Sequence, residues 1–180
     1  MGIVHDPGEI ERLARQRERE NWEFRAWIKG RGPDDNMLNE LVHELTDRVW
    51  AEIDCTQCAN CCRVTSTIVV PDEFTPLSRA LGLSIEEFKA NILRFDSRDK
   101  CWELPEPCPL LVGNLCRVYD DRPQQCRDYP NLHHDLRSHS IARFANAEIC
   151  PIVFNVIESL KLELRWPGLR RWRGRSRRRR

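Results

Sequence analysis

The sequence lacks any stretch of about 18 or more apolar residues, the length that a membrane-spanning helix requires. Residues 1–20 are densely charged and contain no apolar segment of the kind found in a secretory signal peptide. Gly2 follows Met1, but Asp6 stands where an N-myristoylation signal requires Ser or Thr. These absences predict a cytoplasmic protein.

The sequence also lacks an even number of cysteines: it has nine in 180 residues. An odd number fits a disulfide framework poorly, and the cytosol keeps most thiols reduced. Cysteines at this density in a cytosolic protein favour metal binding or redox chemistry.

Acidic residues are absent from residues 165–180, which contain nine arginines together with Trp166 and Trp172. Removing those nine from the 29 basic residues leaves 20 against 28 acidic ones, a net charge near −8. A disordered tail is one interpretation of this segment. Another is binding to nucleic acid through phosphate contacts and stacking, or to another anionic partner such as a membrane or the acidic body of a second copy.

Four cysteines fall within eight residues, in the pattern Cys55-x-x-Cys58-x-x-Cys61-Cys62. A two-residue gap lets two sulfurs converge on one centre, as at zinc and iron–sulfur sites. Adjacent side chains diverge, so Cys61 and Cys62 are expected to play different roles.

The remaining cysteines lie downstream: Cys101, Cys108, Cys116, Cys126 and Cys150. Two of them, Cys108 and Cys150, are followed by proline. The first three cysteines of the cluster match the start of the bacterial ferredoxin run, in which proline follows the fourth ligand. This slightly favours a four-iron, four-sulfur cluster. Eight thiolates can equally form two four-cysteine zinc sites, so zinc remains the alternative.

The ordered series of cysteines resembles the YkgJ family of cysteine-cluster proteins, which is described as a zinc- or iron-chelating domain. After the CxxCxxCC opening, the matching elements are Cys108-Pro109, Cys116 with Tyr119 and Arg122-Pro123, Cys126-Arg127 with Tyr129-Pro130, and Cys150-Pro151. The resemblance covers about residues 53–152. Ala59 departs from it, because the family usually has glycine after the second cysteine.

The resemblance implies metal binding by a defined set of cysteines. That set is Cys55, Cys58, Cys61, Cys62, Cys108, Cys116, Cys126 and Cys150. Cys101 lies outside the family pattern and is expected to be a buried or free thiol.

The resemblance leaves the biological role and any catalytic residue undefined. A related protein, the flagellin lysine N-methylase, combines a similar cluster with methyl transfer, but no glycine-rich nucleotide loop occurs here. Two alternatives to a chelating protein stay open. One is a redox or group-transfer enzyme that uses the cluster, and the other is a zinc-containing adaptor that recruits an anionic partner through its arginine tail.

Several polar residues near the cysteines have more than one interpretation. The histidines His133, His134 and His139 could bind a metal, although a solvated loop is favoured where thiols are plentiful. Arg122 could donate to cluster sulfurs or anionic groups, or pair with Asp120 or Asp121.

The residue patterns predict a mainly helical α+β fold held together by metal, with N-terminal helices, a short-stranded sheet and irregular cysteine-bearing loops. The expected division is a helical segment over residues 1–52, a cysteine-cluster domain over 53–164 and a tail over 165–180. Helices are predicted over residues 9–29, 35–54, 71–81, 85–95 and 151–164. Strands are predicted over residues 66–70 and 140–144, and irregular structure over 96–136.

Overall fold

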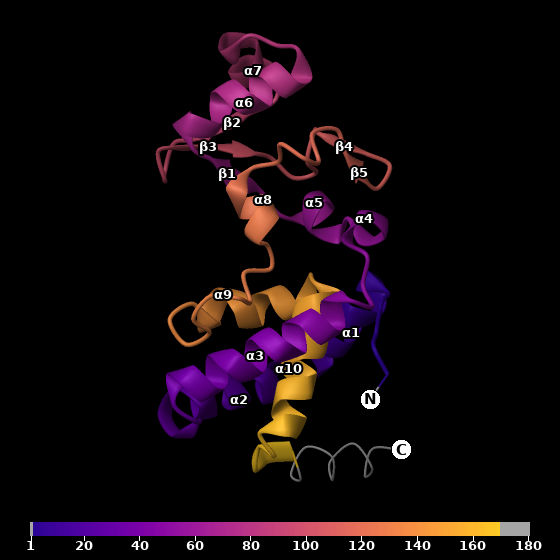
Figure 1. Ribbon diagram of the computed structural model, residues 1–180, viewed down its shortest axis with the longest axis vertical. Coiled ribbons are helices and arrows are strands. Elements are labelled where there is room, and N and C mark those ends of the chain that lie inside the picture. The colour runs from indigo at the N-terminus through magenta and orange to yellow at the C-terminus, as the bar shows by residue number, and fades with distance from the viewer. Residues whose placement is uncertain (1, 170–180) are drawn as a thin grey trace. The chain divides into compact units, whose positions relative to one another are not determined.

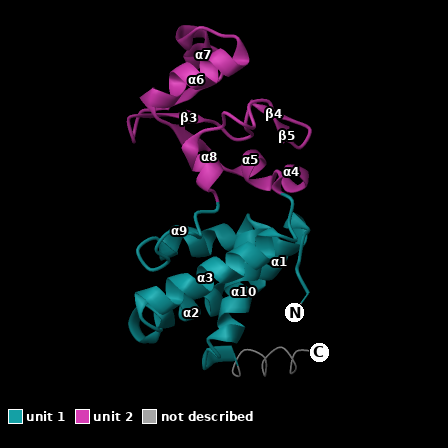
Figure 2. Cartoon of the chain, viewed as in Figure 1, with its two compact units in different colours: residues 1–54, 130–180 teal, residues 55–129 magenta. Residues whose placement is uncertain are grey.

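The computed structural model describes residues 2–169 and divides the chain into two compact units (Figure 2). Unit 1 comprises Met1–Asp54 and Pro130–Arg180, and unit 2 comprises Cys55–Tyr129. Unit 2 is therefore inserted into the sequence of unit 1. Residues 130–164, which the sequence prediction assigns to the cysteine-cluster domain, belong to unit 1.

Unit 1 is helical (Figure 1). Its elements are α1 (Pro7–Gln16), α2 (Glu18–Arg31), α3 (Asp35–Trp50), α9 (Ser140–Ala145), the 3₁₀-helix η1 (Asn146–Glu148) and α10 (Pro151–Glu163). The α3 helix begins where predicted, because the Asp34 carboxylate accepts a 3.0 Å hydrogen bond from the Met37 amide. The α10 helix packs against α1, α3 and η1, and is buried on nearly all sides.

Unit 2 combines short helices with two small sheets. Its helices are α4 (Cys55–Cys58), α5 (Asn60–Val64), α6 (Pro71–Leu81), α7 (Ile85–Asn91) and α8 (Gln124–Asp128). Its strands are β1 (Thr67–Val69), β2 (Arg94–Asp96), β3 (Cys101–Leu104), β4 (Leu111–Val112) and β5 (Leu115–Cys116). One sheet has the order β1-β3-β2 and the other is the hairpin β4-β5, and all pairs are antiparallel.

The core of unit 2 lies between the helices α6 and α7 and the three-stranded sheet. It consists of Val69, Phe74, Leu77, Phe88, Leu93, Leu104, Leu110 and Val118. The side chains of Cys108 and Cys116 pack against this core. The apolar core therefore fixes two of the cysteine-bearing segments.

The predicted class is confirmed, since the chain is mainly helical with small sheets. The capping box of Ser84 and Glu87 and the end of α6 at Gly82 are also confirmed. Four predictions are wrong. The helix predicted over residues 9–29 is divided at Arg17 into α1 and α2, and the segment predicted to be irregular over 96–136 contains β3, β4, β5 and α8. Residues 140–144 form α9, whose buried Ser140, Arg143 and Phe144 repeat at helical spacing. The helix predicted to end at Phe95 ends at Asn91, because the strand β2 pairs with β3.

The described residues 2–169 contain no single helix that is long and apolar enough to cross a membrane. One pair of helical segments, Ser140–Glu148 and Pro151–Glu163, is long and apolar enough when taken together, but it is bent by 112°.

Candidate metal centre

The CxxCxxCC segment forms two short helices joined at Ala59 (Figure 1). Ala59 has φ 47° and ψ 18°, a left-handed conformation that favours glycine. Its amide donates a 3.0 Å hydrogen bond to the carbonyl of Cys55, which closes the α4 turn. Ala59 thus separates α4 from α5 in a conformation that glycine adopts without strain, and it is the position at which the chain departs from the family pattern.

Cys62 is joined to the downstream cysteines through the backbone. The Cys108 amide donates a 2.8 Å hydrogen bond to the carbonyl oxygen of Cys62. The Leu111 amide bonds the Cys108 carbonyl at 3.1 Å, and Leu111 is the cross-strand partner of Cys116 in the β4-β5 hairpin. These contacts bring three cysteine-bearing segments into one place.

Cys126 reaches the same neighbourhood from α8. The Ile68 amide donates a 3.0 Å hydrogen bond to the Gln125 side chain, which ties α8 to β1. The Cys126 thiol donates to the Thr67 hydroxyl at 3.7 Å. We refer to Cys62, Cys108, Cys116 and Cys126 as the four-thiol group; each is partly buried.

The thiols of this group interact electrostatically. A hydrogen bond from Cys61, assisted by the positive charges of Arg63 and Arg122, lowers the pKa of Cys62 to about 7 against the effect of burial. Burial, followed by negative charge on Cys62, Cys108 and Cys116, raises the pKa of Cys126 to about 11 against a hydrogen bond with Thr67. Ionisation of one thiol thus opposes ionisation of the next, as expected of close neighbours.

Burial also raises the pKa values of Cys108 and Cys116, and in both cases negative charge on Cys62 contributes. The positive charge of Arg122 acts to lower the pKa of Cys116. Arg122 itself stacks over the Tyr119 ring, 3.8 Å from its centroid, and donates to the Tyr119 carbonyl at 3.1 Å. Arg122 therefore places its charge beside the four-thiol group.

The donor chemistry of this group fits a metal that prefers sulfur ligands. Four thiolates are the ligands of structural zinc sites and of iron–sulfur clusters. In the described residues 2–169, however, no three Cys, His, Asp or Glu side chains are placed so that they could hold one metal ion. Ligation at about 2.3 Å from zinc to sulfur would require the thiols to move closer together.

The other predicted ligands occupy different positions. Cys55 and Cys58 lie at the two ends of α4, and Cys61 lies in α5 next to Cys62. Cys150 is buried in unit 1, directly before α10. Cys101 lies at the start of β3, opposite Asp96. Burial, followed by the nearby acidic residues, raises the pKa of the Cys101 thiol.

The three histidines lie in unit 1, in a different unit from the four-thiol group. His133 forms a 2.8 Å hydrogen bond with the Asp47 carboxylate through Nε2, and its ring stacks on Trp50 with 6.2 Å between centroids. His139 precedes α9. The contacts of His133 were not foreseen from the sequence, because Asp47 and Trp50 are distant along the chain.

Part of the predicted tail belongs to unit 1. Trp166 is 4% exposed, and its ring centroid lies 5.3 Å from that of Phe24. This aromatic side chain is therefore part of the helical core. Trp172 and the arginines from 170 onward lie outside the described residues.

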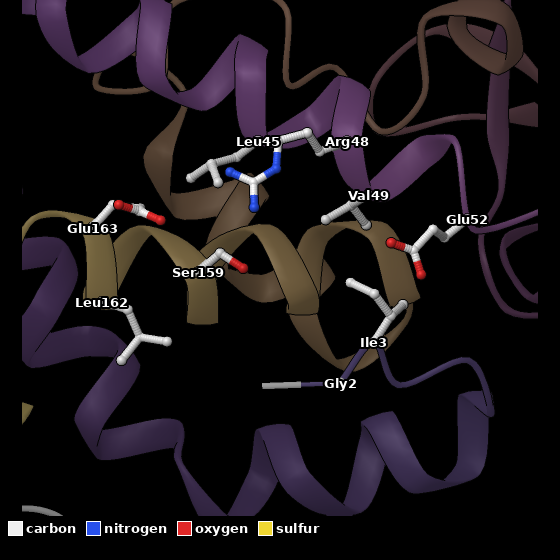
Figure 3. A pocket seen from close by; sticks show the side chains of 9 residues that line it. All are labelled: Gly2, Ile3, Leu45, Arg48, Val49, Glu52, Ser159, Leu162 and Glu163. Carbon is white, nitrogen blue, oxygen red and sulfur yellow. The ribbon is translucent and has the colours of Figure 1, made fainter.

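Unit 1 also contains a pocket of about 280 Å³ between α3, α10 and the N-terminal segment (Figure 3). Arg48, Glu52 and Glu163 supply its charged lining, while Leu45, Val49 and Leu162 are among its apolar residues. No cysteine lines it, so it contributes nothing to thiol chemistry.

The family model CxxCxxCC, "Putative zinc- or iron-chelating domain", matches residues 54–151. The chain belongs to this family. The match of the CxxCxxCC domain begins directly before Cys55 and ends directly after Cys150, so it contains all nine cysteines. No curated protein and no solved structure matches the chain. The family supports chelation of zinc or iron, in agreement with the chemistry of the four-thiol group.

Proposed function

We propose that this CxxCxxCC domain chelates a metal through Cys62, Cys108, Cys116 and Cys126, either iron in an iron–sulfur cluster or zinc. The observation that supports the proposal most directly is the Cys108-to-Cys62 backbone hydrogen bond, together with the electrostatic interaction of all four thiols. Cys55, Cys58, Cys61 and Cys150 complete the ligand set that the sequence pattern predicts.

The surroundings of the four-thiol group suit this role. The metal would supply the positive charge that stabilises buried thiolates, because thiols ligate in the deprotonated form. Arg63 and Arg122 lower the electrostatic cost of negative charge at Cys62. The core behind Cys108 and Cys116 excludes water from one side of the group.

The proposal is tested by purifying the full chain without oxygen and measuring metal, acid-labile sulfide and visible absorbance. Iron with sulfide gives a brown protein, and near-stoichiometric zinc gives a colourless one; either result supports chelation. Thiol labelling before and after addition of a chelator then identifies the protected cysteines. A metal-free, folded protein whose four-thiol group labels at the same rate with and without added zinc or reconstituted iron and sulfide would refute the proposal.

A further inference from the structure

We propose that Arg63 and Asn114 are positioning residues for the metal centre, which hold the α4 turn and the β4-β5 hairpin together before metal binds. This inference rests on the proposed function, because it assigns how the ligand-bearing segments are held. We call these two residues and their shared contacts the Arg63–Asn114 clamp.

The clamp consists of four hydrogen bonds within unit 2. Arg63 donates to the carbonyl of Cys58 at 3.0 Å, to the carbonyl of Gly113 at 3.1 Å, and to the side-chain oxygen of Asn114. The Asn114 amide group donates to the carbonyl of Gln57 at 2.6 Å. The CxxCxxCC segment therefore contacts the hairpin through the Arg63 side chain and the Gln57 carbonyl, and the hairpin contributes the Asn114 side chain and the Gly113 carbonyl.

The secondary structure of the α4 turn and of the hairpin tip contributes little to their stability, although the base of the hairpin packs against the core at Cys116. The helix α4 has four residues, fewer than a stable isolated helix requires. Each strand of the β4-β5 hairpin has two residues, and a two-stranded hairpin is marginal by itself. At the hairpin tip Val112 is 63% exposed and Leu115 is 58% exposed, so apolar burial does not fix the tip. Polar contacts are left to set its position.

The hairpin turn supplies two of the three acceptors of Arg63, the Gly113 carbonyl and the Asn114 side chain. Gly113 has φ 62°, and glycine at the first central position of a two-residue loop is typical of a type II′ turn. The guanidinium group has a rigid fork of donors that can bond several oxygens at once. A lysine at position 63 would retain the charge but could not reproduce this set of contacts.

The clamp links residues that flank proposed ligands on two segments. Gln57 and Cys58 belong to the α4 turn, and Asn114 lies two residues before Cys116. Loss of residues that orient metal ligands commonly lowers metal affinity about 10- to 100-fold. We expect a loss of this size when the clamp is broken, because the segments must then be ordered during binding.

The test compares metal binding by the full chain and by variants Arg63→Ala, Arg63→Lys and Asn114→Ala. Arg79→Ala is the matched control, since Arg79 is an exposed arginine at the end of α6 in the same unit. Zn²⁺ affinity is measured by competition with a chelator, and the absorption of bound Co²⁺ reports the number of thiolates. If the purified protein carries an iron–sulfur cluster, iron and sulfide content after reconstitution replaces the zinc measurement.

Arg63→Ala and Asn114→Ala should each weaken binding about 10- to 100-fold and reduce thiolate-to-Co²⁺ absorption. Arg63→Lys should remain close to Arg63→Ala, and Arg79→Ala should match the unmodified chain. The double variant Arg63→Ala/Asn114→Ala should bind metal only slightly more weakly than the single variant that has the lower affinity, because both residues belong to one clamp. The metal-free variants should unfold at the same temperature as the Arg79→Ala control.

Unchanged affinity in Arg63→Ala, or full recovery in Arg63→Lys, would overturn the positioning role while leaving chelation intact. The metal-free Arg63→Ala chain could instead unfold at a lower temperature. If that loss of stability accounted for the entire loss of affinity, the positioning role would also be overturned. Failure of the unmodified chain to bind metal through thiols is the separate result that removes the proposed function.

Discussion

The backbone amide of Cys108 donates to the carbonyl oxygen of Cys62 at 2.8 Å. This bond joins the last cysteine of the CxxCxxCC cluster to the first Cys-Pro segment. It depends on the backbone alone, so substitution of either thiol leaves it in place. The thiols can therefore be tested without removing the contact that brings their segments together.

Replacing Cys126 by serine should reduce metal binding, whereas replacing Cys101 by serine should not. Cys126 belongs to the four-thiol group, but Cys101 lies opposite Asp96 in the three-stranded sheet. We expect at least about a tenfold loss of affinity for Cys126→Ser, because serine is a poor ligand for metals that prefer sulfur. Metal content and chelator competition measure the difference. Equal losses in both variants would contradict the assignment of ligands.

Ala59→Gly should stabilise unit 2 by up to about 1 kcal/mol. An L-residue in the left-handed conformation costs about 1–2 kcal/mol, of which the greater entropy of unfolded glycine offsets a part. Gly82→Ala is the reciprocal control: Gly82 has φ 69°, and an added Cβ would meet no atom within 4 Å. That substitution should destabilise through backbone conformation alone. Urea unfolding midpoints should move in opposite directions for the two variants.

The local elements of the fold were predictable because their signals are local. Ser84 and Glu87 form the predicted capping box, and Gly82 ends α6 in the left-handed conformation. The strand predicted over residues 140–144 was wrong because Ile141 is exposed and the buried positions follow helical spacing. Short segments offer too few residues to distinguish the two periods.

The sequence pattern predicts which cysteines bind metal but does not predict how they are grouped. That grouping depends on contacts between distant residues, such as Ile68 with Gln125 and Arg63 with Asn114. The stacking of Arg122 on Tyr119, in place of the ion pair considered with Asp120 or Asp121, is likewise set by the fold. Hydrogen bonds of this kind leave no periodic signal in one sequence.

The stability of unit 1 should fall between about pH 4 and pH 2, partly through Asp135. Hydrogen bonds from Ser138, then one from Asn39, lower the pKa of this carboxyl from 3.8 to about 2. A carboxyl with a depressed folded-state pKa stabilises the fold above its unfolded value, and the contribution disappears as pH falls through the folded value. The loss should therefore begin near pH 4 and be complete only below pH 2.

Asp135→Asn should accordingly be less stable than the unmodified chain at neutral pH and should lose less stability on acidification. Ser138→Ala, which removes one donor, should change the acid profile in the same direction by a smaller amount. Thermal unfolding measured from pH 6 to pH 2 provides the comparison. Parallel profiles for Asp135→Asn and the unmodified chain would show that this carboxyl contributes nothing to acid sensitivity.

A buried ion network in unit 1 gives the largest expected effect on stability. The Lys161 ammonium is 0% exposed and donates to Glu20 at 2.9 Å, Asn21 at 2.6 Å and Glu158 at 2.6 Å. All three of its donors are used, and Glu158 also accepts from Arg17. The network joins α10 to α2 and to Arg17, the residue directly before α2, through charges that are poorly solvated.

Lys161→Met should destabilise the protein by about 3–5 kcal/mol, because it leaves the buried Glu20 carboxylate without its cation and Glu158 with Arg17 alone. The fit of the methionine side chain contributes little to this loss, since it has a similar length. Adding Glu20→Gln and Glu158→Gln to the same chain should recover more than half of the loss, because the buried negative charges are then removed while Arg17, which loses its partner Glu158, is partly exposed to water. Urea unfolding of the single and triple variants measures this recovery. If the three substitutions were instead additive, Lys161 would stabilise unit 1 through packing, and the pairing of charges would be incidental.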